Sequence, residues 1–218
     1  MLLSIVVLFC DYDVCYLNRA ISSIKKNVKF SDYEIIAVDN RETNKDPLIL
    51  DNVKVITKGY NLNCFEGRRF GFENSSGEYI WNFDADDLMI DRLYKEDLTG
   101  AEAYQLFYKM DDGPTFDKKV HFSWFRQGAW CRVYKREILK KVYSRIDRPV
   151  NIFMHEDLLL LRLVQKEVKQ WDYITRVIYQ YNHSLASYRL KSPKKAKESS
   201  EEDYQYICRI IEERNLLK

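Results

Sequence analysis

The residues best suited to chemistry are three aspartates close together in the sequence, Asp84, Asp86 and Asp87. They directly follow an apolar run, 78–83, that predicts a buried strand. Two carboxylates one residue apart at a strand end supply the oxygen ligands that Mg²⁺ and Mn²⁺ prefer, with positions left for substrate phosphates. Taken alone, the same pattern is more often a solvated acidic turn that caps the following helix. The elements around the cluster must therefore decide its role.

The elements before this cluster predict a parallel sheet. Short β-branched runs alternate with segments whose apolar residues recur at helical spacing, and this alternation is typical of βαβ units. The expected strands are 4–10, 34–38, 53–56 and 78–83, and the expected helices are 14–27 and 63–74. In such sheets, ligands bind beyond the carboxyl ends of the strands. Because Asp11, Asp39 and Asp84 each follow a strand end, we expect them to share one crevice.

The second half of the chain has a different pattern. Two strand-like runs joined by a turn sequence predict a hairpin, and they are followed by helices, another strand and an amphipathic tail. These segments are 103–110, 115–122, 136–142, 156–168, 171–181 and 199–217. The predicted fold class is α/β, with a mostly parallel central sheet flanked by helices, an added hairpin and a C-terminal helix. We expect one domain over 1–188, and a basic linker and amphipathic helix over 189–218 that pack on it.

Composition narrows the class of protein further. The chain has 218 residues, 46% of them hydrophobic, which favours a globular domain with a substantial core. Its net charge of +2 provides no overall field for binding nucleic acid, and its five cysteines form no C-x-x-C pair. The apolar run 2–10 is too short to span a membrane and has no basic region before it. We expect a cytoplasmic protein without a stable membrane span, which could sit peripherally at the inner membrane face.

Five motifs in order resemble those of the family 2 glycosyltransferases, which have the GT-A fold. They are Ser4–Tyr12, Glu34–Asn40, the paired segments Asn61–Asn63 and Gly67–Gly71, Gly77–Asp87, and His155–Asp157. The sequence departs from the family pattern at several positions, among them Arg69, which stands where the family has asparagine. Asn40 replaces the second aspartate of the family's D-D pair, and Asn63 replaces the glycine of N-x-G.

The resemblance implies a nucleotide-diphosphosugar donor, with a UDP-sugar favoured, and Mn²⁺ or Mg²⁺ as cofactor. By analogy, Asp39 accepts from the base edge and Asp84 faces the ribose. Asp86 would hold the metal, while Arg68 would contact the nucleotide or the diphosphate. The donor-binding residues implied are Asp11, Tyr12, Asp39, Arg68, Asp84 and Asp86, with His183 as a further candidate for the metal or the phosphates. A lone histidine such as His183 is also common as a surface or packing residue.

Asp157 matches the family's general base, which takes the proton of an acceptor hydroxyl while that oxygen displaces the diphosphate and inverts the anomeric carbon. Glu156 and Trp130 are implied on the acceptor side. Other readings remain open, because Glu156 and Asp157 could simply complement a helix dipole and Trp130 could be a core residue.

The leading hypothesis is a metal-dependent, inverting glycosyltransferase of the hexosyltransferase type. Its acceptor would be a hydroxyl of a glycan, a lipid-linked sugar or a modified DNA base. The alternative is a non-catalytic nucleotide-sugar-binding module or scaffold with a degenerate site, and an Asp157 facing the crevice would favour the enzyme. The basic stretch 189–197 could bind along the phosphates of DNA or lipid, or it could be a solvated linker. The tail helix could pack on its own domain or pair with a second copy of the chain to form a homodimer.

Overall fold

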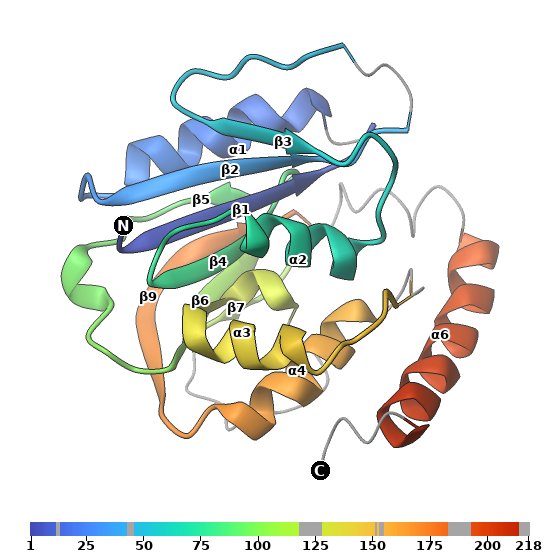
Figure 1. Ribbon diagram of the computed structural model, residues 1–218. Helices are drawn as coiled ribbons and strands as arrows, with labels where there is room; N and C mark the ends of the chain where they lie inside the picture. The colour runs from blue at the N-terminus through green and yellow to red at the C-terminus, as the bar shows by residue number, and fades with distance from the viewer. Residues whose placement is uncertain are drawn as a thin grey trace.

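The computed structural model describes residues 1–11, 14–42, 46–117, 128–150, 152, 155–182 and 193–213. Within these ranges, nine strands form one sheet in the order β3-β2-β1-β4-β8-β6-β9-β5, with β7 paired to β6 (Figure 1). The strands are β1 (Leu3–Phe9), β2 (Tyr33–Asp39), β3 (Lys54–Thr57), β4 (Tyr79–Asp84), β5 (Leu88–Met89), β6 (Ala103–Met110), β7 (Thr115–Phe116), β8 (Arg132–Lys135) and β9 (Trp171–Tyr181). The helices are α1 (Val14–Asn27), α2 (Cys64–Glu73), α3 (Arg136–Ser144), α4 (Glu156–Glu167) and α6 (Pro193–Glu213), with short 3₁₀ turns at Lys95–Asp97 and Ala129–Cys131.

The half of the sheet formed by β3, β2, β1 and β4 is parallel, as predicted. Alternate residues of β1 face opposite sides of the sheet. Leu3, Ile5 and Val7 join the core cluster that contains α1, whereas Val6 joins the cluster that contains α2, α3 and α4. Both faces of the central strand are therefore buried, which explains why its sequence is a continuous apolar run.

Two glycines allow α2 to lie close to β1. A Cβ atom at Gly71 would lie 2.2 Å from Cγ1 of Val6, and one at Gly67 would lie 2.7 Å from Cδ1 of Leu8. Both distances are too short for two carbon atoms, so any larger residue would push the helix away from the sheet. These two glycines, one helical turn apart, thus form the face of α2 that lies against β1.

The rest of the sheet is mixed. β8 joins the parallel half through an antiparallel pairing with β4, and β6 and β7 form the predicted hairpin. β6 then pairs with β9 in parallel and with β8 in antiparallel orientation. The predicted α/β class is confirmed, but two strands, β5 and β8, were not predicted because each has only two to four residues and lacks a long apolar run.

The C-terminal helix begins at Pro193, six residues before the Ser199 start expected from the sequence. Proline is well suited to the first turn of a helix, because its fixed φ fits and its missing N–H would have no partner there. Part of the expected basic linker is thus helical. Ile207 and Ile210 are buried in the same core cluster as α4, and Tyr204 meets the ring of His155 edge-on at 6.3 Å.

Candidate functional site

Two predicted donor-site aspartates lie on either side of the carboxyl end of β1. In the strand register, Asp39 of β2 lies opposite Phe9, and Asp84 of β4 lies opposite Leu8. Asp11 follows the same strand end, and its Oδ2 accepts from the main-chain N–H of Glu42 at 2.7 Å. The convergence of these three strand ends, expected from the parallel topology, is confirmed.

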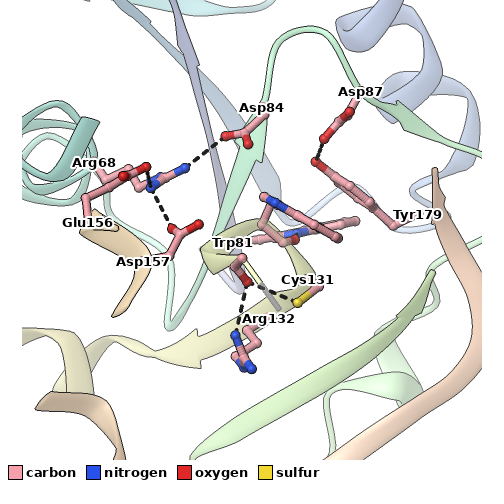
Figure 2. Close-up of polar contacts among 11 residues, drawn as sticks. Arg68, Trp81, Asp84, Asp87, Cys131, Arg132, Glu156, Asp157 and Tyr179 are labelled. Carbon is pink, nitrogen blue, oxygen red and sulfur yellow. Dashed lines mark hydrogen bonds and ion pairs between the residues drawn. The ribbon is translucent and has the colours of Figure 1, made fainter. Parts of the chain in front are cut away.

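Arg68 is the centre of the site (Figure 2). Its guanidinium, with a side chain only 5% exposed, contacts Asp84 at 3.1 Å, Glu156 at 3.1 Å and Asp157 at 2.8 Å. The contacts join α2 to the end of β4 and to the start of α4. Arg68 therefore gathers three carboxylates around one positive charge, and we call these four residues the arginine cluster.

The start of α4 supplies two members of the arginine cluster. His155 precedes the helix in the left-handed conformation, with φ 60° and ψ 17°, which is uncommon for a residue with a side chain. This turn places Glu156 and Asp157 in the first helical turn, where the helix dipole favours negative charge. Their carboxylates nonetheless point to Arg68 and are 15% and 28% exposed, so they do more than complement the dipole.

Electrostatics at the arginine cluster are unbalanced. Burial lowers the pKa of Arg68, but Asp157, Asp84 and Glu156 outweigh it and raise that pKa well above its ordinary value. Burial raises the pKa of Glu156 from 4.5 to about 7, with Asp157 adding to the rise and Arg68 opposing it. Glu156 is thus partly protonated near neutral pH, although it lies beside a buried cation.

The carboxylate of Asp39 is bound by a neighbour that sequence reasoning did not single out. Arg41 donates to Oδ1 through Nε at 2.9 Å and to Oδ2 through NH2 at 2.7 Å, and both side chains are nearly buried. The guanidinium also lies 6.0 Å from the centre of the Phe9 ring. A donor base that reached Asp39 would therefore meet an ion pair, not an isolated carboxylate.

Asn40, which departs from the family pattern, holds the loop before α2. Its Nδ2 donates to the carbonyl of Leu62 at 2.5 Å, and its Oδ1 accepts from the N–H of the same residue at 2.5 Å. An aspartate has no donor and would face the carbonyl with an anion. Asn63, the second departure, caps α2 by accepting from the N–H of Glu66 at 3.0 Å. Both departures thus have structural roles.

The three aspartates at and after the end of β4, Asp84, Asp86 and Asp87, differ in their exposure to solvent. Asp86 and Asp84 are partly exposed, whereas Asp87 is fully buried and accepts from the hydroxyl of Tyr179 and from the main-chain N–H of Asn182. Burial raises the pKa of Asp87, and Asp86 and Asp84 raise it further. Within the described residues, no group of three or more His, Cys, Asp or Glu side chains could hold a metal ion. Asp84 and Asp86 are thus the partly exposed carboxylates of this turn, and a cation held there would need substrate oxygens and water to complete its coordination.

The remaining predicted site residues have different outcomes. Trp130 is buried, and its ring stacks with those of Tyr179 and Tyr181 at 4.9 and 4.7 Å, so it forms part of the core beside the site. Its role on the acceptor side stays a prediction. Tyr12 and His183 lie outside the described residues. Sequence reasoning missed Arg41 and the burial of Asp87, since neither charge nor spacing shows which polar side chains become paired.

The sheet order and the acidic strand ends define a GT-A fold, and solved structures agree. The crystal structure of Staphylococcus aureus TarS 1–349 superposes with a TM-score of 0.69 at 18% identity, over 98% of this chain and 65% of that chain. TarS 1–349 in complex with UDP-GlcNAc superposes with a TM-score of 0.64 at 18% identity, over 91% and 64%. This chain therefore spans just under two thirds of the TarS fragment.

Sequence comparison finds similarity to one family over the first half of the chain. Residues 4–106 match the model of glycosyl transferase family 2. A relative from Haemophilus influenzae, described as an uncharacterized glycosyltransferase, is 27% identical over 175 residues, which cover 72% of this chain and 69% of the relative. The resemblance to family 2 glycosyltransferases of the GT-A fold is thereby confirmed. No helix in the described part of the chain is both long and apolar enough to cross a membrane.

Proposed function

We propose that this chain is a metal-dependent, inverting glycosyltransferase that moves a sugar from a nucleotide-diphosphate donor to a hydroxyl acceptor. The observation that carries the proposal is the arginine cluster. In it, Asp157, the residue matching the family's general base, binds the same guanidinium as Asp84, which lies at the donor strand end. A binding module would need no carboxylate at this place. The orientation of Asp157 therefore favours the enzyme over the module.

The donor side is formed by the carboxyl ends of β1, β2 and β4. We assign Asp39 and its partner Arg41 to the nucleotide base, Asp84 to the ribose and Asp86 to a divalent cation, Mn²⁺ or Mg²⁺. Such a cation, when bound, offsets the negative charge that the diphosphate gains as the sugar bond breaks. A UDP-sugar is the favoured donor, because a protein with the same fold, TarS, has been crystallised with UDP and with UDP-GlcNAc.

The acceptor side is assigned to the start of α4. Asp157 binds Arg68 through Oδ1, and its Oδ2 has no hydrogen-bond partner within the described residues. Oδ2 takes the proton of the acceptor hydroxyl while that oxygen bonds to the anomeric carbon. The bond from this carbon to the diphosphate oxygen breaks on the opposite face, so configuration inverts and the diphosphate leaves with the electron pair. Arg68 holds Asp157 in place and cannot itself accept the proton.

Calorimetric titration of UDP, GDP, ADP and TDP tests the donor site without an acceptor. We expect one nucleotide, UDP, to bind in the presence of Mn²⁺ and to lose most of its affinity after chelator is added. Asp86→Asn should weaken this binding. If none of the four nucleotides binds with or without Mn²⁺, the assignment of a donor site is wrong.

A second experiment tests the base. Asp157→Asn should bind UDP like the wild type but abolish release of UDP from UDP-GlcNAc in the presence of a hydroxyl acceptor pool. The matched control is Asp172→Asn, which removes an exposed carboxylate on β9. Wild-type turnover by Asp157→Asn would refute the assigned role.

A further inference from the structure

Asp87 is the one residue of the Asp84–Asp87 turn whose carboxylate is turned into the core. It is 0% exposed, and its two oxygens have two different partners on or just after β9. Oδ2 accepts from the hydroxyl of Tyr179, as Figure 2 shows, and Oδ1 accepts from the main-chain N–H of Asn182 at 2.7 Å. A carboxylate held at both oxygens has a fixed rotation, so the backbone that carries it is fixed as well.

Asn182 makes a second connection to the same turn. Its side-chain Nδ2 donates to the main-chain carbonyl of Asp86, and Arg19 of α1 donates to the same oxygen at 3.1 Å. Asn182 is 3% exposed, so its amide is held in place by the surrounding core. The peptide that follows the Asp86 side chain is thus bound from β9 and from α1.

The support behind these contacts is rigid. The ring of Tyr179 is fully buried, stacks with Trp130 at 4.9 Å and 10°, and meets the edge of Phe83 at 5.0 Å. In addition, the strand after the turn is paired with β9, with Leu88 opposite Gln180. Because the ring is fixed, the Tyr179 hydroxyl can donate in only one direction. Such a fixed donor can hold the turn that carries Asp86 to within a fraction of an ångström.

We propose that Asp87, Tyr179 and Asn182 are positioning residues that aim the Asp86 carboxylate for the divalent cation. The inference rests on the proposed function, in which Asp86 binds that cation together with the donor diphosphate. Burying Asp87 beside two other carboxylates costs free energy that an apolar residue would not. Its two acceptor oxygens tie the turn to β9 and to the residue that follows β9, which an apolar side chain could not do.

The experiment compares Tyr179→Phe with Tyr143→Phe. Both remove one hydroxyl from a buried tyrosine and keep the ring, but the hydroxyl of Tyr143 has no hydrogen-bond partner within the described residues. UDP is titrated into each protein with Mn²⁺ and with chelator. We expect Tyr179→Phe to bind UDP about tenfold more weakly than the wild type in the presence of Mn²⁺, which is the order expected for loss of a hydrogen bond to a charged group. In the presence of chelator, its affinity for UDP should equal that of the wild type. Tyr143→Phe should match the wild type in both.

Hydrogen exchange in the metal-free protein is the second measurement. The N–H of Asp87 donates to the carbonyl of Asp84 at 3.1 Å, and it should exchange faster in Tyr179→Phe than in Tyr143→Phe. Asn182→Ala serves as a second variant if Tyr179→Phe does not fold, since it removes the donor to Asp86 and keeps its own main-chain N–H on Asp87.

The outcomes separate the two proposals. If the wild type binds UDP with Mn²⁺ dependence and Tyr179→Phe or Asn182→Ala does the same with unchanged affinity, the positioning role is overturned and the proposed function stands. If the wild type shows no Mn²⁺ dependence at all, the proposed metal site fails and the positioning role fails with it. A loss of affinity that is equal with and without Mn²⁺ also overturns the inference, because it indicates general damage to the donor site.

Discussion

Replacing Glu156 by glutamine should remove a pH-dependent cost from the folded protein. Glu156 is 15% exposed and faces Arg68, Asp157 and Asp84, and its pKa is raised from 4.5 to about 7, chiefly by burial and then by Asp157. A carboxyl whose pKa is higher in the folded state binds protons more tightly there, so folding is favoured below 4.5 and that contribution is lost as the pH rises through about 7. The wild type should therefore lose stability over this window.

The magnitude follows from the same two values. One pKa unit corresponds to about 1.4 kcal/mol, so the rise from 4.5 to about 7 amounts to a cost of about 3 kcal/mol once Glu156 is ionised. Glu156→Gln keeps an oxygen that can accept from Arg68 but carries no charge. Its stability advantage over the wild type should grow by about 3 kcal/mol between pH 5 and pH 8.5, which for a chain of this size is roughly 6–12 °C in Tm.

Urea and thermal unfolding at half-unit steps from pH 5 to pH 8.5 measure this difference. The matched control is Glu137→Gln, since Glu137 also lies in the first turn of a helix, α3, but is exposed. It should change stability by less than about 0.5 kcal/mol across the range. If the difference between Glu156→Gln and the wild type is the same at every pH, then Glu156 does not carry the raised pKa, and the charge balance described for the arginine cluster is wrong.

Three further substitutions test the framework of the site. Arg68→Met should destabilise the protein by about 3–5 kcal/mol in thermal unfolding, because it leaves three carboxylates without their buried cation; a loss below about 1 kcal/mol would contradict this. Asn40→Asp should cost about 2 kcal/mol in urea unfolding, since it places an anion against the carbonyl of Leu62, whereas wild-type stability would show that the loop is held otherwise. Gly71→Ala should cost about 1–3 kcal/mol by the same assay through its clash with Val6, and a stabilised variant would disprove the tight contact.

The framework of the fold could be predicted from the sequence because its signals are local. The apolar run of β1, the helical spacing of α1 and the acidic residues at strand ends are each readable within about fifteen residues. Once the strands are parallel, topology alone brings Asp39 and Asp84 to the two sides of β1. The same reasoning could not find β8, whose four residues become a strand only because β4 and β6 lie on either side of it.

The pairing of charges could not be predicted, because it depends on contacts between distant segments. Arg68 was expected to contact the donor, yet it lies 88 residues before Glu156 in the sequence and meets that residue directly. Likewise, Asp87 could not be distinguished from Asp84 and Asp86 by residue type, and only its buried partners on and just after β9 separate it from them. The sequence thus predicted that Asp11, Asp39 and Asp84 follow neighbouring strand ends, but not which charged side chains bind one another.

The paired charges have a consequence for donor binding. Arg68 brings one positive charge to three carboxylates, so the arginine cluster carries a formal charge of −2 when all three are ionised and −1 when Glu156 is protonated. Arg41 is already paired with Asp39. A diphosphate bound at these strand ends would bring further negative charge and be repelled, since like charges repel more strongly in a partly buried site than in water. Donor binding should therefore depend on an added cation at the partly exposed Asp86, and tight binding of UDP in the presence of chelator would contradict this account of the crevice.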